Sequence, residues 1–141
     1  MIGMVYETKV GTFDISEENV INFKNGIPGF ENLRKFAVIS LAETEPIKWL
    51  VSLEDKNIAL PVVDPWIAFS DYSINLNQSV LDELENPAKE HVLVFCVISL
   101  KEPVTINLIA PIIINLEKGI GMQVILEGTN YSVKEPIKAR D

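Results

Sequence analysis

Alternation of hydrophobic and polar residues is strongest in the segment 104–126. Over 104–108 the period of two is typical of a half-buried strand. Pro111 interrupts the pattern, because proline has no N–H for a strand pair, and the pattern resumes over 112–116 and 122–126. The charged, glycine-containing turn between these last two segments indicates a β-hairpin. We expect the sheet to assemble on this hairpin.

Similar short segments fill most of the chain, and one helix interrupts them. The helix is expected at about 78–85, after an N-cap at Asn77 and before Asn86-Pro87. The segment 66–76 is expected to be irregular or a short strand. Further strands are predicted at 4–10, 12–15, 20–23, 36–41, 49–53, 58–63, 92–98 and 131–134.

These elements predict an all-β fold, mainly antiparallel, that forms a barrel or a strongly curved sheet with one short helix. A chain of 141 residues is long enough for one well-buried core. We therefore expect a single domain over residues 1–141.

The formal net charge of −8 argues against direct binding to nucleic acid or to an anionic membrane surface, because both repel an acidic protein. It favours basic partners instead. The single cysteine, Cys96, excludes an internal disulfide framework and is typical of a reducing cytoplasm. The N-terminus shows no signal-peptide pattern, and the longest apolar run, 92–98, is too short to cross a bilayer.

Candidate catalytic chemistry is sparse. The only histidine, His91, lies five residues from Cys96, so on one strand the two side chains point to opposite faces. We expect Cys96 in the core and His91 at the surface. Histidine and cysteine do not cluster with metal-ligand spacing, and Gly119-Ile120-Gly121 belongs to a hairpin turn rather than to a phosphate loop. No metal site and no cofactor are predicted.

The acidic residues and the tryptophans each leave two interpretations open. The acidic segments are either a solvated face or a partner site, and Trp49 and Trp66 are either core residues or interface anchors. Paired carboxylates form in space, so the sequence does not exclude them. The residues thus indicate an acidic β domain that binds something. The alternative is a small-molecule or oligosaccharide-binding β-barrel, or a hydrolase built on one.

Several motifs, in order along the chain, resemble the flagellar assembly factor FliW family. Its pattern is matched by Gly11-Thr12-Phe13-Asp14-Ile15, by the segment 23–31 that contains Gly-Ile-Pro-Gly-Phe-Glu, by residues 49–54, by Asp64-Pro65, and by the segments 107–115 and 123–126. The matches extend from about residue 7 to residue 137. One departure is Pro61, where the family pattern has an aromatic residue; it indicates an edge or a bulge in that strand.

The resemblance implies a cytoplasmic, non-enzymatic protein with a barrel-like fold and two partners. One partner is flagellin, bound before export through its helical terminal region. The other is CsrA, a small RNA-binding dimer that represses translation. The two compete, so that when flagellin is exported the freed factor binds CsrA and relieves repression of flagellin mRNA. We expect the factor itself to be a monomer.

Partner-binding residues are predicted at the shaped loop 26–31 and in the acidic segments. In the loop, Ile27 and Phe30 are candidates for lining an apolar groove; the alternative is a rigid turn that closes the barrel. The acidic candidates on the binding surface are Glu31, Glu54, Asp55, Asp82, Glu83 and Glu85. Electrostatic attraction predicts a strong salt dependence for the CsrA complex and a weak one for the flagellin complex.

Overall fold

A computed structural model describes residues 3–137. Its helices are α1 (Pro65–Ala68) and α2 (Gln78–Glu83), with 3-10 turns at Glu17–Asn19, Ala42–Thr44 and Lys89–His91. Its strands are β1 (Gly3–Thr8), β2 (Gly11–Ser16), β3 (Ile21–Asn22), β4 (Lys35–Ser40), β5 (Lys48–Ser52), β6 (Ala59–Val63), β7 (Val92–Ser99), β8 (Thr105–Ile106), β9 (Ile112–Asn115), β10 (Ile120–Gln123) and β11 (Glu135–Pro136).

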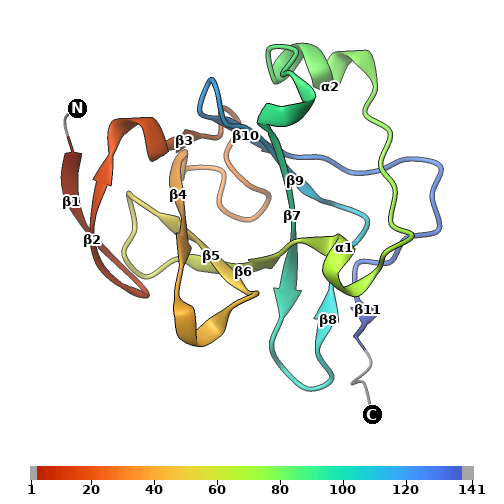
Figure 1. Ribbon diagram of the computed structural model, residues 1–141, viewed down its shortest axis with the longest axis horizontal. Coiled ribbons are helices and arrows are strands. Elements are labelled where there is room, and N and C mark those ends of the chain that lie inside the picture. The colour runs from red at the N-terminus through yellow and green to blue at the C-terminus, as the bar shows by residue number, and fades with distance from the viewer. Residues whose placement is uncertain (1–2, 138–141) are drawn as a thin grey trace.

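Seven strands close into a barrel (Figure 1). Their order is β7-β6-β5-β4-β3-β10-β9, and β9 pairs with β7 to complete the circle. Every pair is antiparallel except β3 with β10, which is parallel and joins the two strands through Asn22 and Ile120. The short strands β8 and β11 extend from β7. The predicted all-β, mainly antiparallel barrel is confirmed.

Large apolar side chains fill the barrel interior. Phe23, Phe36, Leu50, Ile112 and Ile114 are each at most 1% exposed and belong to one cluster. The Phe23 and Phe36 rings meet edge to face, with centroids 5.3 Å apart. Burial of each such side chain stabilises the fold by about 1.5–3 kcal/mol. The interior is therefore a packed core rather than a ligand chamber.

The β1–β2 hairpin covers one outer face of the barrel and lies at the left of Figure 1. Its strand β2 buries Ile15 against Ala37 of β4 and Val51 of β5. In β4 and β5, alternate side chains thus pack inside the barrel and under the hairpin, which is why both faces of these strands are apolar.

A second outer layer, formed by the chain 64–91 and by the C-terminal segment 124–137, covers β6, β7 and β9. Tyr72 fixes this layer to the segment between β8 and β9, because its hydroxyl donates a 2.8 Å hydrogen bond to the carbonyl of Leu108. The Trp66 Nε1–H in turn donates to the carbonyl of Tyr72 at 2.6 Å. The long connection between β6 and β7 is therefore anchored by specific bonds and not only by apolar contact.

Two predictions for single elements were wrong. The segment after Asp64 begins with the helix α1, because the Asp64 side chain accepts a hydrogen bond from Trp66 N–H and Pro65 occupies the first helical position. The predicted strand 131–134 is absent from the described chain. There the Ser132 hydroxyl accepts from Lys134 N–H, which forms a turn, and the strand β11 follows it.

Pro61 pairs in regular register with Trp49, so the edge or bulge predicted for this strand is absent from its pairing with β5. The hydrogen bond from Ser52 N–H to the carbonyl of Ile58 shows that even-numbered residues of β6 bond to β5. Pro61 therefore turns its ring nitrogen towards β7, whose pairing with β6 begins only at Val62. The missing N–H costs no ladder bond.

Candidate functional site

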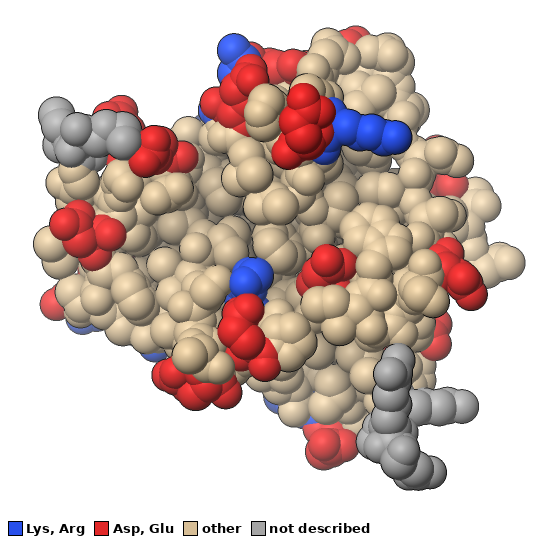
Figure 2. Space-filling model, viewed as in Figure 1, with Lys and Arg blue, Asp and Glu red and all other residues tan. Residues whose placement is uncertain are grey.

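A groove of about 740 Å3 with a mainly apolar lining lies beside α1. Two large hydrophobic side chains stand out from it: Trp66 is 38% exposed and Ile67 is 56% exposed. Figure 2 shows a face on which a few charged groups are separated by broad areas of uncharged residues. We call this surface the apolar groove; its apolar lining residues include Trp66, Ile67, Ile74, Leu76, Leu81, Val92 and Val94.

The shape of the groove follows from the local bonds of α1. The hydrogen bond from Trp66 to Tyr72 fixes the indole, which also meets the Tyr72 ring edge to face at 5.5 Å. Asn77, whose side chain accepts from Val80 N–H, starts α2 and so positions Leu81 in the opposite wall. Side chains that are already fixed in place thus form the groove, and this lowers the entropic cost of binding.

Most charged groups that line the groove already have a partner within the protein, and Lys89 is the exception among the described residues. Glu45 and Lys48 form an ion pair of 2.9 Å, and Asp64 accepts the N–H of Trp66. The floor is apolar, so the groove is suited to apolar side chains of another protein rather than to a charged small molecule.

The loop 26–31 is a rigid turn and not the predicted apolar groove. Ile27 is 3% exposed and belongs to the barrel core, and Phe30 N–H donates to the carbonyl of Ile27 at 2.7 Å. Only glycine fits at position 26, because its φ of 65° is positive and because a Cβ there would lie 2.6 Å from the Glu31 carbonyl oxygen. Of the two interpretations of this loop, the buried Ile27 and the Phe30 hydrogen bond favour the rigid turn. Binding of a partner by Phe30 stays a prediction.

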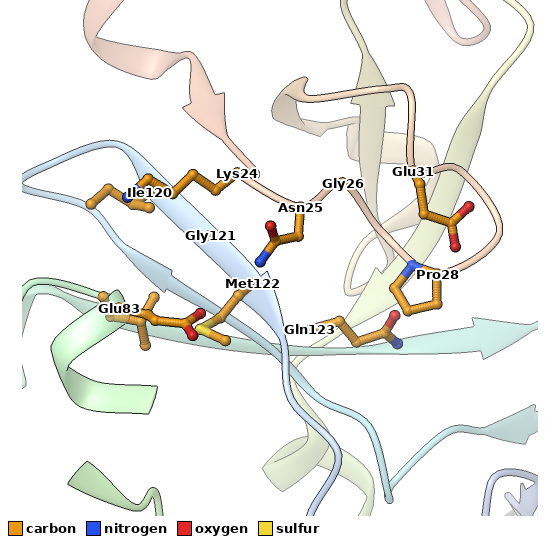
Figure 3. A pocket seen from close by; sticks show the side chains of 11 residues that line it. Lys24, Asn25, Gly26, Pro28, Glu31, Glu83, Ile120, Gly121, Met122 and Gln123 are labelled. Carbon is orange, nitrogen blue, oxygen red and sulfur yellow. The ribbon is translucent and has the colours of Figure 1, made fainter. Parts of the chain in front are cut away.

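Two predicted acidic residues, Glu31 and Glu83, line one small pocket of about 170 Å3 (Figure 3). Figure 3 shows them on opposite sides of the pocket, with Met122 and Asn25 between them. Glu31 accepts the N–H of Gly29 at 3.0 Å, and this bond lowers the pKa of its carboxyl group. The fold therefore gathers acids that are far apart in the sequence.

The other predicted acidic residues stabilise turns. Glu54 Oε1 accepts the N–H groups of Arg34 and Lys35 at 2.6 and 2.9 Å, and these two bonds lower its pKa. Asp55 accepts the N–H of Asn57 in the loop after β5. These bonds explain why a glutamate ends the 49–54 motif: it holds the start of β4.

Asp82 and Glu85 lie at the end of α2. Asp82 Oδ1 accepts from the amides of Gln78 and Asn86 at 2.8 and 3.3 Å. Glu85 has a positive φ of 61°, so the chain reverses there rather than continuing the helix. A local turn accounts for these two acids, and their contact with a partner stays a prediction.

Cys96 and His91 lie in separate environments, as predicted. Cys96 is fully buried in the outer layer, and burial raises the pKa of its thiol to about 11. The His91 side chain is 40% exposed, and its Nδ1 lies 3.3 Å from Glu117 Oε2. Among residues 3–137, no group of three or more potential ligands could hold a metal ion, and no helix is long and apolar enough to cross a membrane.

Comparison with known proteins identifies the family. The profile described as "FliW protein" matches residues 4–137. The chain belongs to the FliW family. It is 48% identical to the flagellar assembly factor FliW of Thermosipho africanus over 95% of both chains. It is 47% identical to the FliW of Thermotoga maritima, over 93% of this chain and 91% of that one.

A crystal structure of the flagellar assembly factor FliW matches this FliW-family chain with a TM-score of 0.90 and 30% identity, over 97% of this chain and 99% of that one. The barrel described above is therefore the fold of the family. The predicted family is confirmed.

The groove residues Trp66 and Ile67 were missed as a candidate site. A usable signal was present, because Asp64-Pro65 is an N-cap followed by a proline at the first helical position. That signal predicts the helix α1. It does not predict the exposure of Ile67, which depends on how the following loop packs.

Proposed function

We propose that this protein holds flagellin in the cytoplasm before export and, when free of flagellin, binds the repressor CsrA and so relieves repression of flagellin mRNA. It acts by binding and not by catalysis. Membership of the flagellar assembly factor family supports this proposal, and the packed barrel interior favours protein partners over the small-molecule or hydrolase alternative.

The apolar groove is the observation that carries the flagellin half of the proposal. An amphipathic helix inserts apolar side chains, spaced three or four residues apart, into such a groove. Trp66 and Ile67 offer exposed apolar contact area at its edge, while Tyr72 holds the indole in place. Export-competent flagellin would bring its helical terminal region to this surface.

The charge of the protein supports the CsrA half. An RNA-binding protein presents a basic surface to phosphates, and a chain with a net charge of −8 is attracted to such a surface. The acidic chain then competes with the RNA for the same kind of surface, or repels RNA phosphates from it.

Substitution of one exposed groove residue tests the flagellin half. Ile67→Asp places a charge at the apolar groove, and we expect binding of purified monomeric flagellin, measured by calorimetry, to weaken by about tenfold or more. The matched control is Ile125→Asp, since Ile125 is 68% exposed and is not among the groove residues. Equal binding by the two variants, or no binding by the wild type, would contradict the proposal.

A further inference from the structure

The barrel wall is interrupted beside β4. This strand pairs with β5 along all of 36–40, but its other neighbour, β3, has only two residues. β3 begins at Ile21, which pairs with Phe36, and its only other residue, Asn22, pairs with Lys35. Residues 38–40 of β4 therefore have a strand on one side only.

The main chain of β4 directs hydrogen-bonding groups into this interruption. Leu53 N–H donates to the carbonyl of Lys35, so the odd-numbered residues of β4 bond to β5. Val38 and Ser40 then direct their N–H and C=O groups to the other side. Within residues 3–137, no backbone or side-chain group forms a hydrogen bond with the main chain of Val38. A free strand edge is a template for another strand.

A hollow of about 330 Å3 adjoins this free edge. Phe13 and Ile15 of β2 border one side of it, and Leu93 and Leu116 border the other. Leu116 is 48% exposed although it follows the fully buried strand β9. We call the free edge and the hollow the seam. It offers both unpaired main-chain groups and apolar contact area.

The rim of the seam is acidic. Asp14 and Glu18 line the hollow, and the adjoining depression adds Glu17 and Glu117, with Lys118 as the basic residue among the lining residues. The side chains of these acids are exposed, so their field reaches a partner in solution. This charge selects a basic occupant.

We propose that the seam binds an extended, basic segment of the CsrA partner by strand addition to β4. The segment forms main-chain hydrogen bonds with Val38 and Ser40, inserts an apolar side chain beside Leu116, and brings basic residues to Asp14 and Glu18. Strand addition obtains affinity from the main chain and specificity from alternate side chains, and the seam provides for both. This inference rests on the proposed function for CsrA.

One residue connects the seam to the apolar groove. Leu93, near the start of β7, lines both surfaces. A partner in the groove and a partner in the seam therefore both lie against this residue. Occupation of one surface changes a wall of the other, which gives a physical basis for competition between the two partners.

Amide hydrogen exchange on the complex with purified CsrA tests the strand addition. The amides of Val38 and Ser40 should exchange at least tenfold more slowly in the complex, because they become hydrogen-bonded. The amides of Ala37 and Ile39, already bonded to β5, provide the internal control and should change little.

Two variants complete the test. Val38→Pro removes the N–H at the free edge without removing a bond to β5, and it should weaken CsrA binding at least tenfold. Should that chain fail to fold, the double variant Asp14→Asn/Glu18→Gln should weaken binding by a similar factor at low salt. Its matched control is Glu43→Gln/Glu127→Gln, with two exposed acids outside the seam.

The outcomes separate the two levels of the proposal. If wild-type protein does not bind CsrA at all, the proposed function is wrong. If it binds, but the Val38 and Ser40 amides gain no protection and the Asp14/Glu18 variant binds like its control, strand addition at the seam is wrong while the proposed function stands.

Discussion

The buried side-chain amide of Asn115 donates a 2.7 Å hydrogen bond to the carbonyl of Leu84. The oxygen of the same amide accepts the N–H groups of Glu117 and Lys118 at 3.1 and 3.4 Å. One side chain therefore fixes the end of α2 against β9 and shapes the turn between β9 and β10. Neither element is long enough to be stable alone.

Removal of this amide should destabilise the whole fold. Asn115→Ala leaves the buried carbonyl of Leu84 without its donor, and we expect a loss of about 2 kcal/mol in the free energy of unfolding. Asn115→Asp should cost more at pH 7, because a carboxylate oxygen then faces that carbonyl. Urea denaturation measures both, with Asn25→Ala as the exposed control. A loss below about 0.5 kcal/mol would contradict the assigned role.

Glycine at position 85 should stabilise the protein. Glu85 has a φ of 61°, a conformation that costs a non-glycine residue about 1 kcal/mol. Glu85→Gly removes this cost but gains freedom in the unfolded chain, so we expect a net gain of about 0.5 kcal/mol by urea denaturation. The control Glu83→Gly, inside α2, should destabilise the protein by about 1 kcal/mol. Destabilisation by both substitutions would contradict the argument.

The Glu54 carboxylate should make stability depend on acid pH. Its pKa is below the ordinary value of 4.5 because Arg34 and Lys35 donate backbone hydrogen bonds to it. A lowered folded-state pKa stabilises the fold above the unfolded-state pKa, and this contribution is lost as pH falls through the folded-state value.

We therefore expect Glu54→Gln to lower the free energy of unfolding by about 1 kcal/mol at pH 7, an amount reduced by the exposure of the side chain to solvent. The difference from wild type should shrink as pH falls below about 4. Urea denaturation at a series of pH values checks this. A difference that is constant from pH 7 to pH 3, or as large in Glu43→Gln, would contradict the role of the carboxylate.

Cys96 should be inert in the folded protein. Its thiol is fully buried, and the rise of its pKa from 9.0 to about 11 lowers the thiolate fraction at pH 8 by about 100-fold. A disulfide reagent such as 5,5′-dithiobis(2-nitrobenzoate) should react at least about 100-fold more slowly with the native protein than with the urea-unfolded chain. Comparable rates in the two states would show that the second outer layer opens readily.

Ionic strength should affect the affinities for the two partners differently. The affinity for CsrA should fall steeply between low and moderate ionic strength, because opposite charges attract the partners and salt screens them. The affinity for flagellin should change little, since the apolar groove has few unpaired charges. Calorimetric titrations at several salt concentrations measure both. Two equally insensitive complexes would refute the electrostatic argument for CsrA.

Local signals in the sequence were sufficient to predict most of the individual helices and strands. Asn77 caps α2 as predicted, and its side chain accepts from Val80 N–H at 3.0 Å. The apolar run 92–98 is the barrel strand β7, which is covered on both faces. In each case, the physical cause lies within a few residues of the element itself.

Relationships across the fold could not be predicted in this way. Glu31 and Glu83 share a pocket only because the end of α2 packs beside the loop after β3. The seam exists because β3 begins only at Ile21, after the 3-10 turn Glu17–Asn19, and a short strand has almost no periodic signal. The exposure of Trp66 depends on a carbonyl six residues away, at Tyr72.

The parallel pair of β3 and β10 has a consequence for synthesis. It joins Asn22 to Ile120, which the ribosome adds only after strands β4 to β9. Until then, β3 of the nascent chain can pair with β4 but not with β10, and the circle of strands stays open. Closure of the barrel therefore follows the synthesis of β10 and has the slow kinetics of long-range strand pairing. A polypeptide cut before β10 would expose its apolar interior and aggregate.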